Sequence, residues 1–194
     1  MKRSRAREYA CGDFYVRLSE EGDAYCVEYS EQLEEHCPHV VLMLRERCMS
    51  REELAQRFGD VEGLVEELTS RCPELARRAS LRSTADSLRL QGWVVHAGKD
   101  LVEAFLARGF LTVEARIKPL SLAFSELSVK VRMYPGSLQE ALDMRYPLLL
   151  LGLQVEGLLP VLVASALEER LFNCQVPDIL ASLVEQVERV IKRF

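Results

Sequence analysis

The alternation of apolar and polar side chains from Phe110 to Lys118 places the strongest constraint on the fold of this chain. Apolar residues at every second position predict a half-buried strand, because successive side chains of a strand point to opposite faces of the sheet. The segment from Leu127 to Tyr134 follows the same rule, with Lys130 and Arg132 on its outer face. The two segments therefore predict a sheet with one face on a core and the other toward solvent.

Further elements are predicted on both sides of these strands. Leu148 to Leu153 is fully apolar, which is typical of a central strand, and Pro147 is expected to end the helix before it. The other elements predicted for the second half are a strand over Trp93–Val95, an amphipathic segment over 99–108 that could form a helix, a helix from Ser137 to near Tyr146, a turn at Val155–Gly157, a strand over Leu158–Ala164 and an amphipathic helix over 176–193.

The first half of the chain predicts a β-hairpin followed by helices. Two alternating segments, Gly12–Leu18 and Ala24–Tyr29, flank a turn at Glu20–Asp23. Ser50 begins one of the helices as the first residue of a capping box, and Gly59 ends it. The helices are expected at about 39–48, 50–59, 60–71, 74–79 and 83–90.

Together these elements predict an α+β fold in three parts. An N-terminal hairpin with helices (1–80) precedes a mixed sheet with flanking helices (81–173), and a helical extension (174–194) ends the chain. The stretch from Pro73 to Ser83 is the expected boundary between the first two parts.

The charge balance limits the functions that this chain can have. With 25 basic and 30 acidic residues, its formal net charge is −5, whereas a free-standing nucleic-acid binder is usually basic. The helices expected between 39 and 71 have helix-turn-helix spacing, but the third one carries Asp60, Glu62, Glu66 and Glu67. An acidic recognition helix would repel phosphate, so we exclude ordinary DNA readout and predict a packed helical subdomain. A local basic patch, or RNA contact through a partner, stays open.

Composition also bears on source and location. Arginine (20 residues) far outnumbers lysine (five), which together with the charge density indicates a GC-rich genome and a thermophile. The longest apolar stretch, Pro147 to Leu153, is too short to span a bilayer. No apolar run follows the basic residues at Met1–Arg5, so no signal peptide is expected. We therefore predict a cytoplasmic protein with no membrane partner.

The six cysteines are interpreted as structural. None of them forms a C-x-x-C pair, so neither a zinc ribbon nor a thioredoxin motif is indicated. His36, Cys37 and His39 stand close together, but a metal site needs a fourth ligand and usually a second cluster, and neither is evident. No metal and no cofactor are therefore predicted. In a mesophile's cytosol the thiols would be reduced, whereas in a hyperthermophilic archaeon some could form disulfides.

No motif places a nucleophile beside a base, so no catalytic residue is predicted. The pattern G-x-S-x-G is absent. Gly98-Lys99-Asp100 lacks the upstream glycines of a phosphate loop and predicts a turn. His96 stands alone, and a lone histidine of this kind is more often structural than catalytic.

The second half of the chain resembles the archaeal tRNA-splicing endonuclease family. In that family a helix ending L-R-x-R-G leads into a strand with Phe or Tyr followed by V-V, then a basic residue and a glycine, and Leu88–Gly98 (LRLQGWVVHAG) follows this order. Val40–Arg47 resembles the family's E-A-x-Y-L-L-E-R-G helix, and Ser125–Val131 resembles the start of its next strand. Ser137–Leu142 continues the order. The resemblance covers residues 39–165 and implies a nuclease-like fold for the second half.

The resemblance also implies that this chain lacks the family's chemistry. The family cleaves RNA with a Tyr, a His and a Lys, which act as base, acid and charge stabiliser. The position of the His holds Phe124, that of the Lys falls on or near Pro147, and Val102–Ala107 occupies the region of the Tyr. Phenylalanine and proline cannot transfer protons, so the chain alone is expected to be inactive. His96 matches a scaffold position.

By this resemblance, the chain is expected to be the structural, non-catalytic subunit of a heteromeric endonuclease that removes introns from pre-tRNA. Its partner would be the catalytic subunit, in an α2β2 assembly that contacts pre-tRNA. In the family an acidic loop between the last two strands enters a basic cleft on the opposing subunit. The carboxylate in the corresponding turn here is Glu156. The strands predicted over Leu148–Leu153 and Leu158–Ala164 are more apolar than one sheet face requires, so the expected interface also includes Leu149, Leu151, Leu159 and Val161.

Two alternatives stay open at this point. The chain could be a protein-interaction subunit of another archaeal nucleoprotein complex. It could also be a small-molecule enzyme whose catalytic residues form no recognisable motif.

Overall fold

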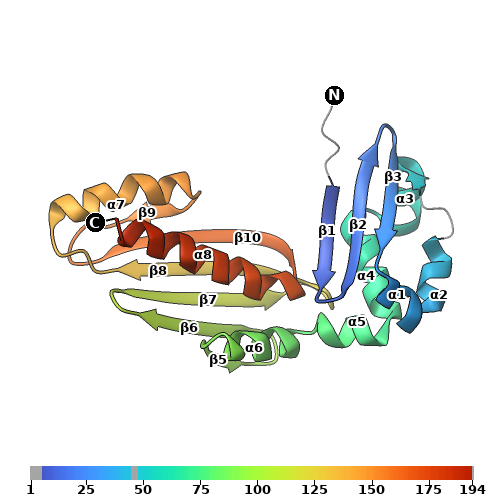
Figure 1. The fold of residues 1–194 in the computed structure, drawn as a ribbon, viewed down its shortest axis with the longest axis horizontal. Coiled ribbons are helices and arrows are strands. Elements are labelled where there is room, and N and C mark those ends of the chain that lie inside the picture. The colour runs from blue at the N-terminus through green and yellow to red at the C-terminus, as the bar shows by residue number, and fades with distance from the viewer. Residues whose placement is uncertain (1–5, 45–47, 194) are drawn as a thin grey trace. The chain divides into compact units, whose positions relative to one another are not determined.

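The computed structural model describes residues 6–44 and 48–193. It contains helices and two antiparallel sheets, which confirms the predicted α+β class (Figure 1). The chain forms two compact units. Unit 1 comprises the described residues of Met1–Ser83 with two later segments, Ser121–Phe124 and Phe172–Gln175. Unit 2 comprises the described residues of Thr84–Leu120, Ser125–Leu171 and Val176–Phe194.

Unit 1 contains a four-stranded antiparallel sheet with its strands in sequence order. The strands are β1 (Ala6–Cys11), β2 (Phe14–Glu21), β3 (Ala24–Tyr29) and β4 (Cys48–Ser50). The predicted hairpin is confirmed as β2 and β3. The sequence does not predict β1, because most of its side chains are exposed or half-buried and follow no apolar alternation.

Five short helices and one 3-10 turn complete unit 1, and they are α1 (Glu31–His36), α2 (Pro38–Val41), η1 (Leu42–Leu44), α3 (Arg51–Phe58), α4 (Val61–Arg71) and α5 (Pro73–Arg78). The capping box is confirmed, because the Ser50 hydroxyl accepts a hydrogen bond from the Glu53 N–H at 3.1 Å. Gly59 ends α3 with a φ of +83°, a conformation that favours glycine.

The prediction of one helix over 39–48 is wrong. The helical structure ends at Leu44, residues 45–47 lie outside the described residues, and Cys48 belongs to β4. Pairing with β3 explains the difference, because Cys48 stands directly opposite Cys26 in the register of the sheet.

The core of unit 1 draws on segments far apart in the sequence. Phe124 and Phe172 are buried in it, with ring centroids 5.7 Å apart, and Tyr9 of β1 meets each of them edge to face at 5.9 Å. The Glu66 carboxylate on α4 accepts hydrogen bonds from the Ser121 hydroxyl at 2.6 Å and from two backbone N–H groups that follow it. Both later segments are thus integral parts of this unit.

Unit 2 contains a six-stranded sheet in the order β5-β6-β7-β8-β10-β9. The strands are β5 (Val94–Ala97), β6 (Val102–Arg108), β7 (Leu111–Pro119), β8 (Phe124–Met133), β9 (Gln154–Glu156) and β10 (Leu162–Phe172). The two alternating segments of the sequence are confirmed as β7 and β8. The sheet was expected to be mixed, but it is antiparallel, since hairpins join most of its neighbouring strands.

The two faces of this sheet differ as the alternation predicts. Its buried face carries the apolar residues of β7, which are Leu111, Val113, Ala115 and Ile117. The other face is polar, and its charges are paired across strands. Arg116 lies 3.2 Å from carboxylate oxygens of both Glu103 and Glu114, and Glu114 stands opposite Lys130.

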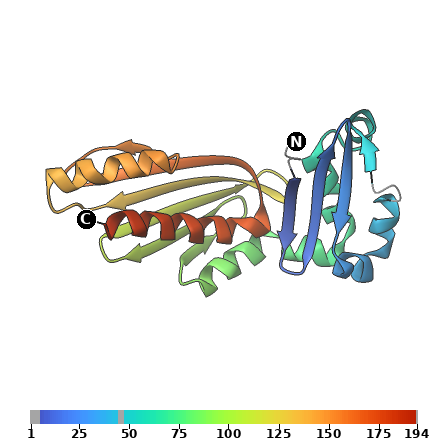
Figure 2. The same cartoon turned by 45° about the horizontal axis from the view of Figure 1, so that its top comes forward.

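Three further helices accompany the sheet, and they are α6 (Leu81–Leu90), α7 (Leu138–Leu150) and α8 (Val176–Ile191), with the 3-10 turn η2 (Asn173–Gln175) before α8. The predicted terminal helix is confirmed as α8, which lies across the sheet in both views (Figures 1 and 2). Its buried residues recur every three or four positions, as an amphipathic helix requires. No helix in the described part of the chain is both long and apolar enough to cross a membrane.

Two predicted elements of the second half have the wrong type. The segment 99–108 contains β6 instead of a helix, because Val102, Ala104 and Leu106 are buried at alternate positions and pair with β7. The apolar segment Leu148–Leu153 is not a strand, since α7 continues through Pro147 to Leu150.

Three strand boundaries also differ from the prediction. Trp93 precedes β5 and is not part of it. The expected turn at Val155–Gly157 begins as strand β9, which ends at Glu156. Strand β10 begins only at Leu162, so residues 158–161 form a connection.

Candidate interaction surface

The residues expected at a subunit interface lie in three consecutive segments of unit 2. Leu149 is half exposed near the end of α7, and Leu151 caps that helix. Glu156 is exposed at the end of β9, the edge strand of the sheet, opposite Val163 of β10. Leu159 and Val161 lie in the connection between β9 and β10. The strand pair that was expected to carry the four apolar residues does not form.

Helix α7 is apolar on two sides. Ala141, Met144 and Leu148 are buried in unit 2. On the other side, five large apolar side chains are between 46% and 69% exposed, and they are Leu138, Leu142, Tyr146, Leu149 and Leu150. At 3.6 residues per turn, these five positions share one face of the helix. We call them the α7 face.

The start of α7 is fixed by local hydrogen bonds. The Ser137 hydroxyl accepts a hydrogen bond from the Glu140 N–H at 3.1 Å, and the Glu140 carboxylate accepts one from the Gly136 N–H at 2.7 Å. These bonds satisfy N–H groups that the first turn of a helix leaves without partners. The first turn of α7, which carries Leu138, is therefore capped.

Charges of opposite sign border the α7 face. The helical rotation of 100° per residue places Arg145 along one edge, beside Leu138 and Leu149, and Asp143 along the other. The Asp143 carboxylate accepts a hydrogen bond from the Gln139 amide at 2.8 Å. A partner surface of complementary charge would thus meet the helix in one orientation.

Sequence reasoning missed most of the α7 face. Leu138, Leu142 and Tyr146 recur at intervals of four within the helix predicted from Ser137, which is the signal of an apolar face. Interpreting Leu148–Leu153 as a strand cut this helix short, so Leu149 was expected at the interface on a strand and Leu150 was missed.

The positions aligned with the nuclease residues have packing roles. Phe124 is 4% exposed within the aromatic cluster of unit 1. Pro147 lies inside α7, and three of the residues in Val102–Ala107 face the core of unit 2. His96 is exposed on β5, with its ring 6.0 Å from that of Phe105. His96 stands opposite Glu103 in the register of β5 and β6, and the Glu103 carboxylate forms an ion pair with Arg116.

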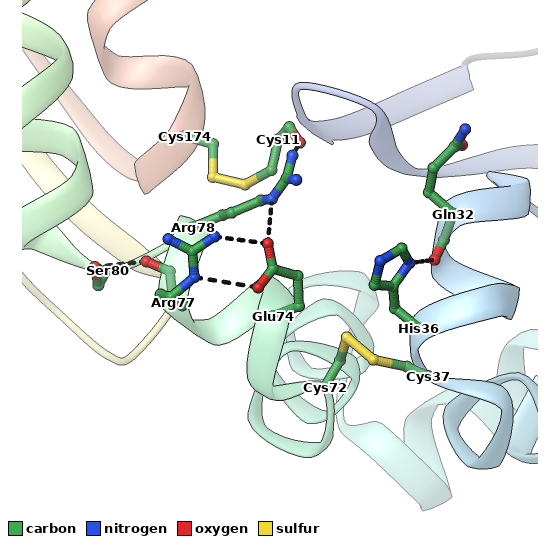
Figure 3. A network of polar contacts seen from close by, with 10 residues as sticks. All are labelled: Cys11, Gln32, His36, Cys37, Cys72, Glu74, Arg77, Arg78, Ser80 and Cys174. Atoms are coloured by element: carbon green, nitrogen blue, oxygen red, sulfur yellow. Dashed lines mark hydrogen bonds and ion pairs between the residues drawn. A yellow bond between two sulfur atoms is a disulfide. The ribbon is translucent and has the colours of Figure 1, made fainter.

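The cysteines form disulfides and hold no metal. All six pair, as Cys11–Cys174, Cys26–Cys48 and Cys37–Cys72. Cys37 is therefore not free to join the neighbouring histidines as a ligand, and a His36 ring nitrogen lies 2.9 Å from the Gln32 carbonyl oxygen instead (Figure 3). Among residues 6–44 and 48–193, no group of three or more His, Cys, Asp or Glu side chains could hold a metal ion.

The large pKa shift in unit 1 belongs to a surface ion pair. Hydrogen bonds from Arg77 at 2.7 Å and from Arg78 at 2.9 Å lower the pKa of Glu74 to about 2 (Figure 3). Burial, and secondarily the nearby Glu62 carboxylate, raise the pKa of Tyr9. Neither group stands beside a nucleophile, so we attribute these pKa shifts to structural contacts.

Fold and surface together define an α+β protein whose most distinctive exposed feature is the apolar α7 face. Comparisons with protein-family models, with curated proteins and with solved structures find no match.

Proposed function

We propose that this chain is a non-catalytic, protein-binding subunit that joins its partner through the α7 face. One observation carries the proposal, namely that α7 is apolar on both its buried and its exposed side. Contiguous apolar patches on soluble proteins mark interaction sites, because water contact with them is unfavourable. A partner helix with its own apolar stripe would cover the five side chains.

The particular complex that we propose is a tRNA-splicing endonuclease, in which this chain is the structural subunit beside a catalytic one in an α2β2 assembly. The sequence resemblance supports it, as does the burial of Phe124 at the position of the catalytic histidine. With three disulfides, the proposed cytoplasmic location requires a hyperthermophilic source, because intracellular disulfides are rare in other organisms.

Reconstitution tests this function. The full chain would be mixed with candidate catalytic subunits and an intron-containing pre-tRNA, and complex formation and cleavage would be measured. We expect cleavage only when both subunits are present. Cleavage by the purified chain alone, after controls for contaminating nuclease, would overturn the non-catalytic assignment.

A matched pair of variants tests the surface. Tyr146→Ser/Leu150→Ser removes two exposed side chains of the α7 face, whereas Leu90→Ser removes a side chain that is 91% exposed on α6. We expect the first variant to lose partner binding and the second to keep it. Equal binding by both variants would exclude the α7 face. Binding through this face to a different protein would keep the interaction function and overturn the endonuclease assignment.

A further inference from the structure

One of the three disulfides is more open to solvent than the others. In Cys26–Cys48, the second residue is exposed and the first is half-buried. Both residues of Cys37–Cys72 are buried, and Cys11–Cys174 joins a buried residue to a half-buried one (Figure 3). A thiolate must reach a sulfur atom to break a disulfide, so access affects which bond reacts first. Cys48 is the most accessible of the six positions.

The place of Cys26–Cys48 in the sheet explains this exposure. The two residues stand directly opposite each other on β3 and β4. Their neighbours Val27 and Met49 are 2% and 3% exposed, and both belong to the core of unit 1. Because successive side chains of a strand point to opposite faces, both cysteines lie on the face turned away from that core. The bond therefore crosses the solvent face of the sheet.

Strand β4 is joined to the sheet by few backbone pairs. It is an edge strand of three residues and pairs with β3 over three residue pairs. By contrast, β1 with β2 and β2 with β3 each pair over six. The end of β4 is fixed separately, because the Arg51 N–H that follows it donates to the Asp23 carbonyl at 3.2 Å. The disulfide thus fastens the beginning of β4, at Cys48, to β3.

We propose that Cys26–Cys48 is a thiol–disulfide exchange site, at which a dithiol reductant opens the bond and releases the Cys48 end of β4 from β3. The reductant approaches from the solvent face, where Cys48 is the more exposed of the two residues. The two more buried disulfides stay closed and keep the rest of unit 1 folded. The proposal is independent of the α7 face, because both cysteines belong to unit 1 and that face belongs to unit 2.

The exchange balances in two steps. A thiolate of the reductant bonds to the Cys48 sulfur, the Cys26–Cys48 bond breaks, and Cys26 leaves as a thiolate. The second thiolate of the reductant then attacks the reductant's own sulfur in this mixed disulfide, and Cys48 leaves as a thiolate. The reductant ends as a disulfide, so two electrons pass to the protein. The two protons that its thiols gave up are taken up by Cys26 and Cys48.

Timed reduction of the folded chain tests the order in which the bonds react. The oxidised full chain would be treated with dithiothreitol, its free thiols alkylated at intervals, and the labelled peptides identified by mass spectrometry. We expect Cys26 and Cys48 to be labelled at least about tenfold faster than the other four cysteines, because burial hinders attack. Label that appears first on another pair, or on all six together, would overturn the proposal.

Two comparisons identify the cause of the preference. In denaturant all three bonds are accessible, so we expect the preference to vanish, and one that persisted would assign it to local sequence, against the proposal. With a limiting amount of glutathione, a monothiol, we expect the trapped mixed disulfide on Cys48. A mixed disulfide found mainly on Cys26 would contradict attack at the exposed sulfur.

Hydrogen exchange tests the release of β4. After selective reduction, we expect faster amide exchange in residues 48–50 and unchanged exchange in β1 and β2, whose longer pairing does not involve this bond. The variant Cys26→Ser/Cys48→Ser is the control, since it lacks the bond without any reductant and should show the same pattern. Unchanged exchange in β4, or an equal increase throughout unit 1, would refute the local release.

Discussion

Cys11 and Cys174 are 163 residues apart in the sequence, and their Cα atoms lie 5.2 Å apart within unit 1. The disulfide joins the end of β1 to η2, so it fastens the late segment Phe172–Gln175 to the first strand of the unit. The other two disulfides close shorter loops, with sequence separations of 22 for Cys26–Cys48 and 35 for Cys37–Cys72.

Removing the long-range disulfide should destabilise the protein more than removing a short-range one. In the chain-entropy treatment, loss of Cys11–Cys174 costs about 5 kcal/mol, whereas loss of Cys26–Cys48 costs about 3 kcal/mol. Denaturant unfolding of Cys11→Ser/Cys174→Ser and of Cys26→Ser/Cys48→Ser measures the difference. If the two double variants unfold at the same denaturant concentration, loop length does not determine the contribution of these bonds.

Asn173→Ala should destabilise unit 1 by about 1–3 kcal/mol, because a buried carbonyl that loses its partner carries the cost of desolvation. The Asn173 amide is fully buried and donates to the Ala79 carbonyl at 2.8 Å and to the Leu122 carbonyl at 3.2 Å. Gln175→Ala is the control, since Gln175 makes its hydrogen bond to the Glu8 carbonyl at the surface. Thermal unfolding compares the two, and an equal effect would contradict the role of burial.

Glu74 should make stability depend on pH in the acid range. Hydrogen bonds from Arg77 and Arg78 lower its pKa from 4.5 to about 2 in the folded protein. Its contribution is therefore complete above pH 4.5 and is lost as the pH falls toward 2. We expect the melting temperatures of the wild type and Glu74→Gln to differ at pH 6 and to converge near pH 2. A difference that is constant over this range would contradict the shift.

Glu156→Gln should weaken assembly with the proposed partner while leaving the fold intact. Glu156 is exposed at the edge strand β9, and a lysine or arginine of the partner would lose its ion pair. The cost for a pair buried on binding is about 2–5 kcal/mol. Partner affinity measured at low salt tests this expectation, with the melting temperature of the isolated chain as the control. Unchanged affinity would remove Glu156 from the interface.

The sequence predicts the elements whose side chains follow one period. The strands β7 and β8 alternate strictly, and α4 and α8 bury residues at helical spacing. The run Leu148–Leu153 lacks polar residues, so the sequence shows neither a helical nor a strand period there. Its first residues continue α7, because Leu148 is buried on the same side of that helix as Ala141 and Met144. In β6, the apolar Phe105 stands at an exposed position between the buried Ala104 and Leu106, so the sequence does not alternate between apolar and polar residues and the strand was obscured.

The interaction surface and the disulfides were harder to predict than the strands. Six cysteines permit 15 pairings, and sequence alone does not choose among them. Glu156 and Leu149 are exposed as an interface requires, whereas the two strands expected to carry the apolar residues do not form as predicted. Phe124 and Phe172 complete unit 1 from beyond its predicted boundary, and only tertiary packing reveals such a contribution.

The discontinuous composition of unit 1 has a consequence for the order in which the molecule is made. Domains usually fold during synthesis from the N-terminus onward. Here the first sheet is translated early, but Phe172 of its core comes much later in the chain, and the cysteine that bonds to Cys11 is translated 163 residues after it. The first sheet must therefore wait, with an open core and a free Cys11 thiol, until the segment Phe172–Gln175 has emerged.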